Sequence, residues 1–343
     1  MEKLSIQDAM TRALKLALEG PAQGVNPQVG AVILNSQGEV IGEGFHKGSG
    51  TPHAEVMALE KALAGKKKLA AGAIAVVSLE PCNHTGKTGP CAQALIDAGI
   101  SKVVFASSDP GDSSSGGAET LRAAGIDVES GLLSDVADHQ LRVWLTSAKS
   151  KRPFVTLKWA SSLDGRAAAE DGSSKWISGS DSRADAHLRR SEVDAILVGT
   201  GTALIDDPEL TARKPDGSFY PTQPLRVVLG ERDLPSTLRV FNEDAETMVL
   251  KTQSIHGALE ELYTRGVKHV FVEGGPTLAS RFVQMDLVDE FVVYLAPKLL
   301  GGDKLAIGSI DVPSIDQAKD LEIFEVKQLG KDVLIVAKPA ERN

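Results

Sequence analysis

One stretch in the first third of the chain constrains its chemistry more than any other. It runs from the triplet His53-Ala54-Glu55 to Cys91 and contains both cysteines of the 343-residue chain, Cys82 and Cys91. One imidazole and two thiolates are a common ligand set for zinc, and three protein ligands leave a fourth position open for catalysis. We therefore predict that His53, Cys82 and Cys91 form a zinc site.

Glu55 stands two positions after His53, where its carboxylate can face a metal without binding it. A carboxylate in that place can take a proton from water and deliver it to a leaving group. The order His-x-Glu, Pro-Cys and a second Cys is typical of zinc-dependent base deaminases. Two alternatives stay open: a closed zinc site with His84 as fourth ligand, and two unrelated buried cysteines.

The charge and hydropathy of the chain narrow the class of partner. A net charge of −9 argues against binding to nucleic acid, which requires clustered cations that neutralise phosphates. No apolar run is long enough for a transmembrane helix, and the first residues lack the apolar core of a signal peptide. We therefore expect a cytoplasmic protein that acts on a small molecule, with no nucleic-acid or membrane partner.

The pattern of strands and helices predicts two α/β domains. The polar, basic segment 146–153 ends in a proline and separates two unlike halves, so we place the boundary between residues 147 and 148. For the first half we expect a helix over 5–19, a hairpin over 29–45, a helix from Thr51 with His53 in its first turn, and strands at 73–78, 102–106 and 126–128. For the second half we expect strands at 154–160, 195–199, 225–229, 246–250, 270–272 and 290–295, and helices at 180–190 and from Thr277.

Further motifs extend over nearly the whole chain. They are the segments 26–30, 42–46, 52–56, 79–82 and 84–91, followed by 158–166, 174–177, 199–213, 273–278 and 295–302. In these segments the sequence resembles the bifunctional riboflavin-biosynthesis family, in which a diaminohydroxyphosphoribosylaminopyrimidine deaminase is joined to a 5-amino-6-(5-phosphoribosylamino)uracil reductase. The resemblance implies an N-terminal cytidine-deaminase-like α/β/α domain (1–147), a C-terminal dihydrofolate-reductase-like α/β domain (148–343), and the cofactors Zn²⁺ and NADPH.

The resemblance also implies two sets of site residues. In the deaminase domain, the substrate contacts would be Asn26, His46, His84, Lys87, Thr88 and Asp109. In the reductase domain, the substrate contacts would be Ser174, Arg190, Leu210, Arg213 and Glu273. The NADPH contacts would be Ala160, Trp176, Thr202, Asp206, Gly275, Pro276, Thr277 and Leu278. Lys158 and Asp206 are candidates for polarising or protonating the centre that is reduced.

The implied reaction has two steps. Water activated at zinc adds to C2 of 2,5-diamino-6-(5-phosphoribosylamino)pyrimidin-4-one and ammonia leaves, and NADPH then reduces the ribosyl side chain to ribityl. Because similar proteins associate through the reductase domain, we expect a homodimer. The open alternatives are a deaminase with a degenerate second domain and a non-catalytic zinc protein that binds a pyrimidine or a partner. Read without the family, Trp176 could be a core residue and Asp206-Asp207 an exposed turn.

Overall fold

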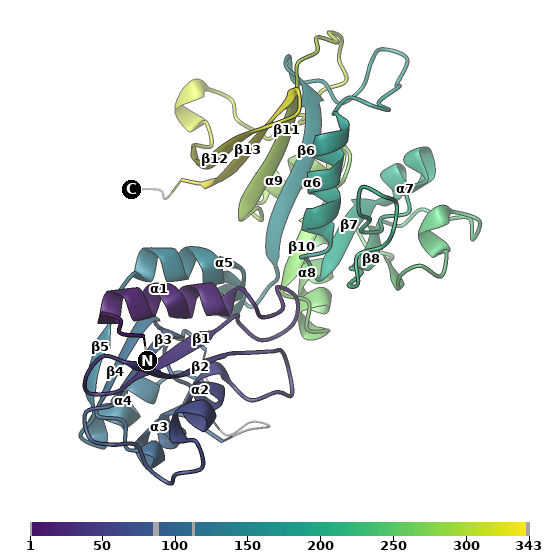
Figure 1. Ribbon diagram of the computed structural model, residues 1–343. Coiled ribbons are helices and arrows are strands. Elements are labelled where there is room, and N and C mark those ends of the chain that lie inside the picture. Colours follow the sequence, from purple (N-terminus) through teal and green to yellow (C-terminus); the bar gives the residue numbers. More distant parts are fainter. Residues whose placement is uncertain (1, 85–88, 112–113, 341–343) are drawn as a thin grey trace. The chain divides into compact units, whose positions relative to one another are not determined.

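The computed structural model describes residues 2–84, 89–111 and 114–340 and divides into two compact units, Met1–Lys151 and Arg152–Asn343 (Figure 1). The division falls four residues after the position that we expected from the sequence. The reason is that helix α5 (Ser134–Ser150) continues through most of the polar segment 146–153. Its C-cap is Lys151, whose backbone has the left-handed conformation. No helix among the described residues has the length and apolarity needed to cross a membrane.

Unit 1 is a three-layer α/β/α structure around a five-stranded sheet, as predicted. The sheet order is β2-β1-β3-β4-β5, with β1 antiparallel to β2 and β3 and with β3, β4 and β5 parallel. Helices α1 and α5 pack on one face and α2, α3 and α4 on the other (Figure 1). The bounds are α1 (Ile6–Ala17), β1 (Gly30–Leu34), β2 (Val40–Phe45), α2 (Ala54–Leu63), β3 (Ile74–Leu79), α3 (Cys91–Ala98), β4 (Lys102–Ser107), α4 (Gly117–Ala123) and β5 (Asp127–Ser130).

Two glycines of β2 allow helix α2 to lie very close to the sheet. A Cβ atom on Gly42 would be 2.1 Å from the carbonyl oxygen of Ala58, and one on Gly44 would be 2.4 Å from that of Ala54. Since Ala54 is the first residue of α2, this contact fixes the start of the helix. We had expected His53 to lie in the first turn of α2, but it is the N-cap that precedes the helix.

Unit 2 is built on an eight-stranded mixed sheet with the order β12-β13-β11-β6-β10-β7-β8-β9. The six strands from β11 to β9 run parallel, and β13 and β12 form an antiparallel hairpin against β11. Two apolar clusters cover its faces, one with α8 and α9 and one with α6 and α7. The bounds are β6 (Phe154–Ser162), α6 (Ser180–Arg190), β7 (Ala195–Gly199), α7 (Thr200–Asp206), β8 (Leu225–Leu229), β9 (Thr247–Leu250), α8 (Ile255–Thr264), β10 (His269–Val272), α9 (Pro276–Gln284), β11 (Glu290–Ala296), β12 (Leu321–Leu329) and β13 (Asp332–Pro339), with short 3-10 turns at η1 (Arg239–Phe241) and η2 (Ile315–Gln317).

Four of these elements were not predicted: α7, α8, β12 and β13. Helix α8 carries a readable signal, because the side chain of Ser254 caps its N-terminus and Ile255, Leu259 and Leu262 lie on one buried face. Strand β12 is the edge of the sheet and exposes most of its residues, so burial does not impose a hydrophobic pattern on it.

Candidate functional site

The three predicted zinc ligands converge in unit 1. His53 caps α2, Cys82 follows β3 and Cys91 begins α3. The Nδ1 atom of His53 lies 3.2 Å from Sγ of Cys91 and 3.4 Å from Sγ of Cys82. The ligand atoms of all three lie within 4.8 Å of one another, and no other His, Cys, Asp or Glu of the described residues joins the group. This geometry favours a site with an open fourth position over a closed one.

The electrostatics of the thiol pair suit a divalent metal. A hydrogen bond from Cys91 lowers the pKa of Cys82 to about 4, whereas the same bond and burial raise the pKa of Cys91. The hydrogen bond with Cys82 raises the pKa of His53. The lowered pKa favours the thiolate of Cys82, the form in which cysteine binds zinc. One imidazole and two sulfurs fit a zinc ion.

His53 and Cys82 line a pocket of about 210 Å³ that also contains Glu55. Burial raises the pKa of Glu55 to about 7. A carboxyl group that titrates near neutrality can both accept and release a proton during turnover. The pocket also brings together four of the predicted substrate contacts, which are Asn26, His46, His84 and Asp109.

His46 is held in one protonation state beside the zinc ligands. Its Nδ1 atom lies 3.2 Å from the carbonyl oxygen of Pro52, and its Nε2 atom lies 2.8 Å from Nδ2 of Asn26. Both contacts are satisfied only when a neutral ring carries its proton on Nδ1. Burial lowers the pKa of His46, which agrees with a neutral ring. The ring meets that of His53 edge-on at a centroid separation of 5.3 Å.

Glu80, which we did not predict, connects two loops at the pocket. Its Oε2 accepts a hydrogen bond from the backbone N–H of Asp109 (3.2 Å), and its Oε1 accepts one from Ala118 at the start of α4 (3.0 Å). Asp109 in turn accepts a hydrogen bond from the N–H of Gly111 (2.7 Å). The sequence signal that could have identified Glu80 is its place between Leu79 and the Pro81-Cys82 pair.

Of the other predicted substrate contacts, Lys87 and Thr88 lie outside the described residues.

A second cleft, of about 550 Å³, lies in unit 2 beyond the carboxyl ends of β6, β7 and β10. Most of the residues that the sequence assigned to the reductase site line it. They are Lys158, Ala160, Ser174, Trp176, Arg190, Thr202, Asp206, Leu210, Arg213, Glu273, Gly275 and Pro276. Thr277 and Leu278 follow in the first turn of α9 and do not line the cleft.

Glu273 is the electrostatic centre of this cleft. Its Oε1 lies 2.6 Å from Nε of Arg190, and its Oε2 lies 3.1 Å from Nη2 of Arg190 and 3.3 Å from Nζ of Lys158. Burial by itself would raise the pKa of Glu273, but the charges of Arg190 and Lys158 outweigh it and hold the pKa at about 2. Glu273 is therefore a carboxylate that orients two cations toward the cleft.

Trp176 projects from the loop before α6 and is largely exposed, so it is not the core residue that the sequence left open. The guanidinium group of Arg183 lies 4.6 Å from the centroid of its ring system, and Nζ of Lys298 donates a hydrogen bond to its carbonyl oxygen (2.7 Å). An aromatic ring held in this way at the mouth of a cleft is available to a planar ligand.

The glycine pair Gly274-Gly275 joins β10 to α9. Gly275 donates its N–H to Oγ1 of Thr202 (3.1 Å), and a Cβ atom on Gly274 would lie 2.7 Å from the side chain of Leu278. The pair leads directly into α9, whose first residue, Pro276, has no N–H and whose Leu278 N–H donates to the carbonyl oxygen of Gly275 (3.1 Å). The cationic side chains that line the cleft, Lys158, Arg190 and Arg213 among them, fit a phosphate-bearing cofactor such as NADPH.

Two family models match the two halves of the chain. The cytidine and deoxycytidylate deaminase zinc-binding region matches residues 4–107, and the RibD C-terminal domain matches residues 153–335. The riboflavin biosynthesis protein RibD of Mycobacterium tuberculosis is 46% identical over 335 residues, which are 96% of each chain. The chain belongs to the RibD family.

Solved structures of RibD proteins have the same architecture. The structure of Acinetobacter baumannii RibD superposes with a TM-score of 0.88 at 36% identity and covers 98% of this chain and 99% of its own. A Thermotoga maritima structure, described as a diaminohydroxyphosphoribosylaminopyrimidine deaminase/5-amino-6-(5-phosphoribosylamino)uracil reductase, gives 0.86 at 35% identity with the same coverage. The predicted family and the two predicted RibD domain folds are thereby confirmed.

Proposed function

We propose that unit 1 deaminates 2,5-diamino-6-(5-phosphoribosylamino)pyrimidin-4-one and that unit 2 reduces the product with NADPH to 5-amino-6-(5-phosphoribitylamino)uracil. As a RibD protein, the chain is a bifunctional enzyme of riboflavin biosynthesis with a zinc-binding deaminase domain and an NADPH-using reductase domain. The observation that carries the proposal is the grouping of three candidate zinc ligands at a pocket that contains a buried carboxyl group, Glu55.

In the deaminase domain, His53, Cys82 and Cys91 would hold zinc, which when bound would supply the Lewis acidity that makes water nucleophilic at neutral pH. Glu55 would take one proton from that water and deliver it to a ring nitrogen, and would then move the second proton from the added hydroxyl group to the amino group, which leaves as ammonia. Neutral His46 positions the pyrimidine beside His53. The remaining contacts to the ring, the ribose and the phosphate come from Asn26, His84, Lys87, Thr88 and Asp109.

In the reductase cleft, NADPH supplies the hydride and the protein orients its nicotinamide against C1′ of the ring-opened ribose. Glu273 holds the Lys158 ammonium in the cleft, and we assign to Lys158 and Asp206 the protonation or polarisation of that centre. The substrate lies against Ser174, Arg190, Leu210, Arg213 and Glu273. NADPH lies against Ala160, Trp176, Thr202, Asp206 and the segment 275–278.

Removal of one zinc ligand tests the deaminase half of the proposal. We expect the wild-type protein to contain about one zinc per chain, to release ammonia from the diaminopyrimidine and to oxidise NADPH with the deaminated product. Cys91→Ser should lose most of the zinc and the ammonia release, because a hydroxyl is a far poorer zinc ligand than a thiolate. Metal analysis and the two assays, run on the same preparation, measure this.

NADPH oxidation by Cys91→Ser should continue, since the pocket and the cleft share no lining residue. Full ammonia release from a zinc-depleted Cys91→Ser protein would contradict the assigned metal site. A wild-type protein that contains zinc but oxidises no NADPH would instead indicate a degenerate reductase domain.

For the assembly and location of the protein, we propose a cytoplasmic homodimer that associates through the reductase unit, without nucleic acid or membrane partners. The edge strand β12 supports the proposal for the interface. It exposes Ile323 and Val326, and as the outermost strand of the sheet it can add a strand of another copy. Burial of such side chains in an interface removes apolar surface from water.

Val326→Lys should convert the dimer to a monomer, because it places a charge within the proposed apolar interface. Light scattering coupled to size-exclusion chromatography measures the mass. Ile315→Lys is the matched control, since Ile315 is also exposed but lies in η2, outside the edge strand. A wild-type monomer, or a Val326→Lys dimer as stable as the wild type, would contradict the proposed interface.

A further inference from the structure

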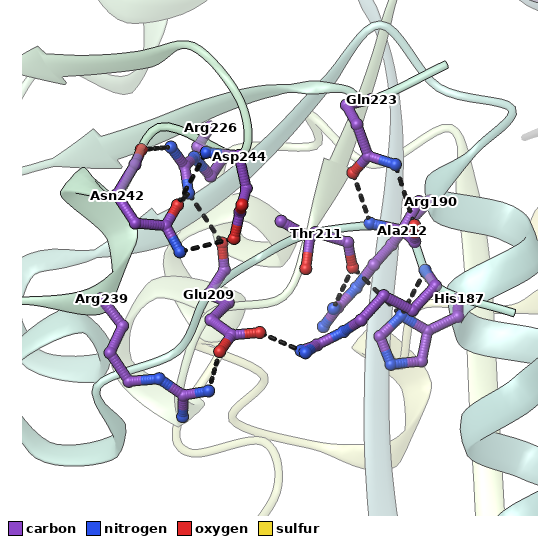
Figure 2. Close-up of polar contacts among 11 residues, drawn as sticks. His187, Arg190, Glu209, Thr211, Ala212, Gln223, Arg226, Arg239, Asn242 and Asp244 are labelled. Carbon is purple, nitrogen blue, oxygen red and sulfur yellow. Dashed lines mark hydrogen bonds and ion pairs between the residues drawn. The ribbon is translucent and has the colours of Figure 1, made fainter. Parts of the chain in front are cut away.

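The reductase cleft contains a second charged cluster, made of Arg213, Glu209 and Arg239, of which only Arg213 has a proposed role. The Glu209 carboxylate forms ion pairs with Nη1 of Arg213 and Nη2 of Arg239, and Figure 2 shows Arg239 reaching it from the neighbouring turn. The Glu209 side chain is 15% exposed, whereas those of Arg213 and Arg239 are 34% and 53% exposed. The carboxylate therefore lies beneath the two guanidinium groups, which face outward.

A fully buried arginine fixes the segments that carry this cluster. Nη1 of Arg226 donates to the carbonyl oxygen of Glu209 (3.2 Å) and to Oδ1 of Asn242 (2.6 Å), and Nη2 donates to the carbonyl oxygen of Asn242 (2.6 Å) (Figure 2). Nη2 also donates to the carbonyl oxygen of Ala245. Burial of a cation is costly, and here it lowers the pKa of Arg226. The guanidinium group of Arg226 thus joins the backbone of Glu209 to the turn that follows Arg239.

Further contacts fix the two arginines of the cluster. The side-chain amide of Gln223 pairs with both the N–H and the carbonyl oxygen of Ala212, each at 2.8 Å, directly before Arg213 (Figure 2). The backbone N–H of Arg239 donates to Oδ1 of Asp207 (2.7 Å). Both guanidinium groups thus extend from anchored backbone, and both line the cleft.

We propose that Arg239 is a further ligand for a phosphate monoester in the reductase cleft, together with Arg213, and that Glu209 positions both guanidinium groups. The cluster has two positive charges and one negative charge, so it keeps a net positive charge for an anion. Guanidinium groups provide donor pairs that match the oxygens of a phosphate. The inference rests on the proposed reductase function, in which two molecules carry this group: the substrate has a 5-phosphate and NADPH has a 2′-phosphate.

The experiment compares Arg239→Gln with Arg265→Gln. Arg265 is the matched control because its side chain is 55% exposed and also pairs with one glutamate, Glu261, but it does not line the cleft. Steady-state kinetics are measured with the deaminated substrate and its dephosphorylated form, and with NADPH and NADH. For Arg239→Gln we expect KM for one phosphate-bearing compound to rise about ten- to hundredfold, the effect of losing a charged hydrogen bond.

The two sources of the phosphate give different patterns. If Arg239 binds the substrate, KM rises for the phosphorylated substrate and not for its dephosphorylated form. If it binds the cofactor, KM rises for NADPH and not for NADH. Unchanged KM values, or equal increases with and without the phosphate, would overturn the inference. A wild-type protein without NADPH oxidation would instead overturn the proposed function, so the two failures are distinguishable.

Glu209→Gln tests the positioning role separately. This change makes the cluster more positive, so charge alone would tighten the binding of a phosphate. If Glu209 orients the arginines, the variant should instead show a higher KM for the same phosphate-bearing compound as Arg239→Gln and an unchanged KM for its phosphate-free form. A lower KM for the phosphate-bearing compound would overturn the positioning role.

Discussion

Glu55→Gln should reduce the rate of ammonia release by about 10²- to 10⁴-fold, the usual contribution of a general acid–base group. Glutamine fills the same space beside the zinc ligands but cannot carry the proton from water to the leaving group. NADPH oxidation with the deaminated substrate should persist, because Glu55 belongs to the pocket of unit 1 and the reductase cleft is lined by unit 2 alone. Ammonia release and NADPH oxidation are assayed separately.

Glu60→Gln serves as the control for this experiment, since Glu60 lies on the same helix, α2, but is exposed. It should retain both activities. The zinc content of Glu55→Gln should equal that of the wild type, which separates the loss of a proton carrier from the loss of the metal. If both activities disappeared together in a zinc-loaded variant, the two sites would not be independent.

Glu273→Gln should have two effects, one on the reductase and one on stability. The change leaves Lys158 and Arg190 without their common carboxylate, and a displaced Lys158 should lower NADPH oxidation by about 10²-fold, a typical cost of misplacing a catalytic group. Ammonia release by unit 1 should be unaffected. Separate assays of NADPH oxidation and ammonia release measure the two activities.

The effect on stability depends on pH. The pKa of Glu273 falls from 4.5 to about 2 in the folded protein. Such a group stabilises the fold above pH 4.5 and loses its contribution as the pH falls toward about 2. The shift corresponds to about 3 kcal/mol. Glu273→Gln should therefore be less stable than the wild type at neutral pH, and the difference should shrink toward pH 2.

Urea unfolding of unit 2 at several pH values measures this difference. Glu261→Gln is the control, because the ion pair of Glu261 with Arg265 is exposed and should contribute little to stability. A difference between Glu273→Gln and the wild type that stayed constant over the whole pH range would contradict the assigned carboxylate.

The grouping of His53, Cys82 and Cys91 near Glu55 could be predicted because one motif contains all four residues. The start of one helix fixes the positions of His53 and Glu55. Cys82 follows a strand that can be predicted from the apolar run of its residues. The strands at 195–199 and 225–229 and the helix at 180–190 have the predicted bounds. Each strand is a short, mostly apolar run, and Gly179 directly precedes the helix.

The contacts that organise the reductase cleft could not be predicted in the same way. Arg226 lies in a strand whose neighbours are apolar, and nothing local distinguishes it from a solvated arginine. The pairing of Arg239 with Glu209 joins residues 30 positions apart through a fold that a linear pattern does not specify. Glu80 is in a readable motif, but its role depends on Ala118, which only the folded chain brings to it.

The division of the chain into two units, each with its own pocket, has a consequence for metabolism. Translation of a single message produces the two active sites in equal number, whatever the level of expression. The ratio of their capacities is then set only by the turnover number of each site. Changes that slow the second site would let the deaminated intermediate accumulate, and greater expression of the whole chain would not alter that imbalance.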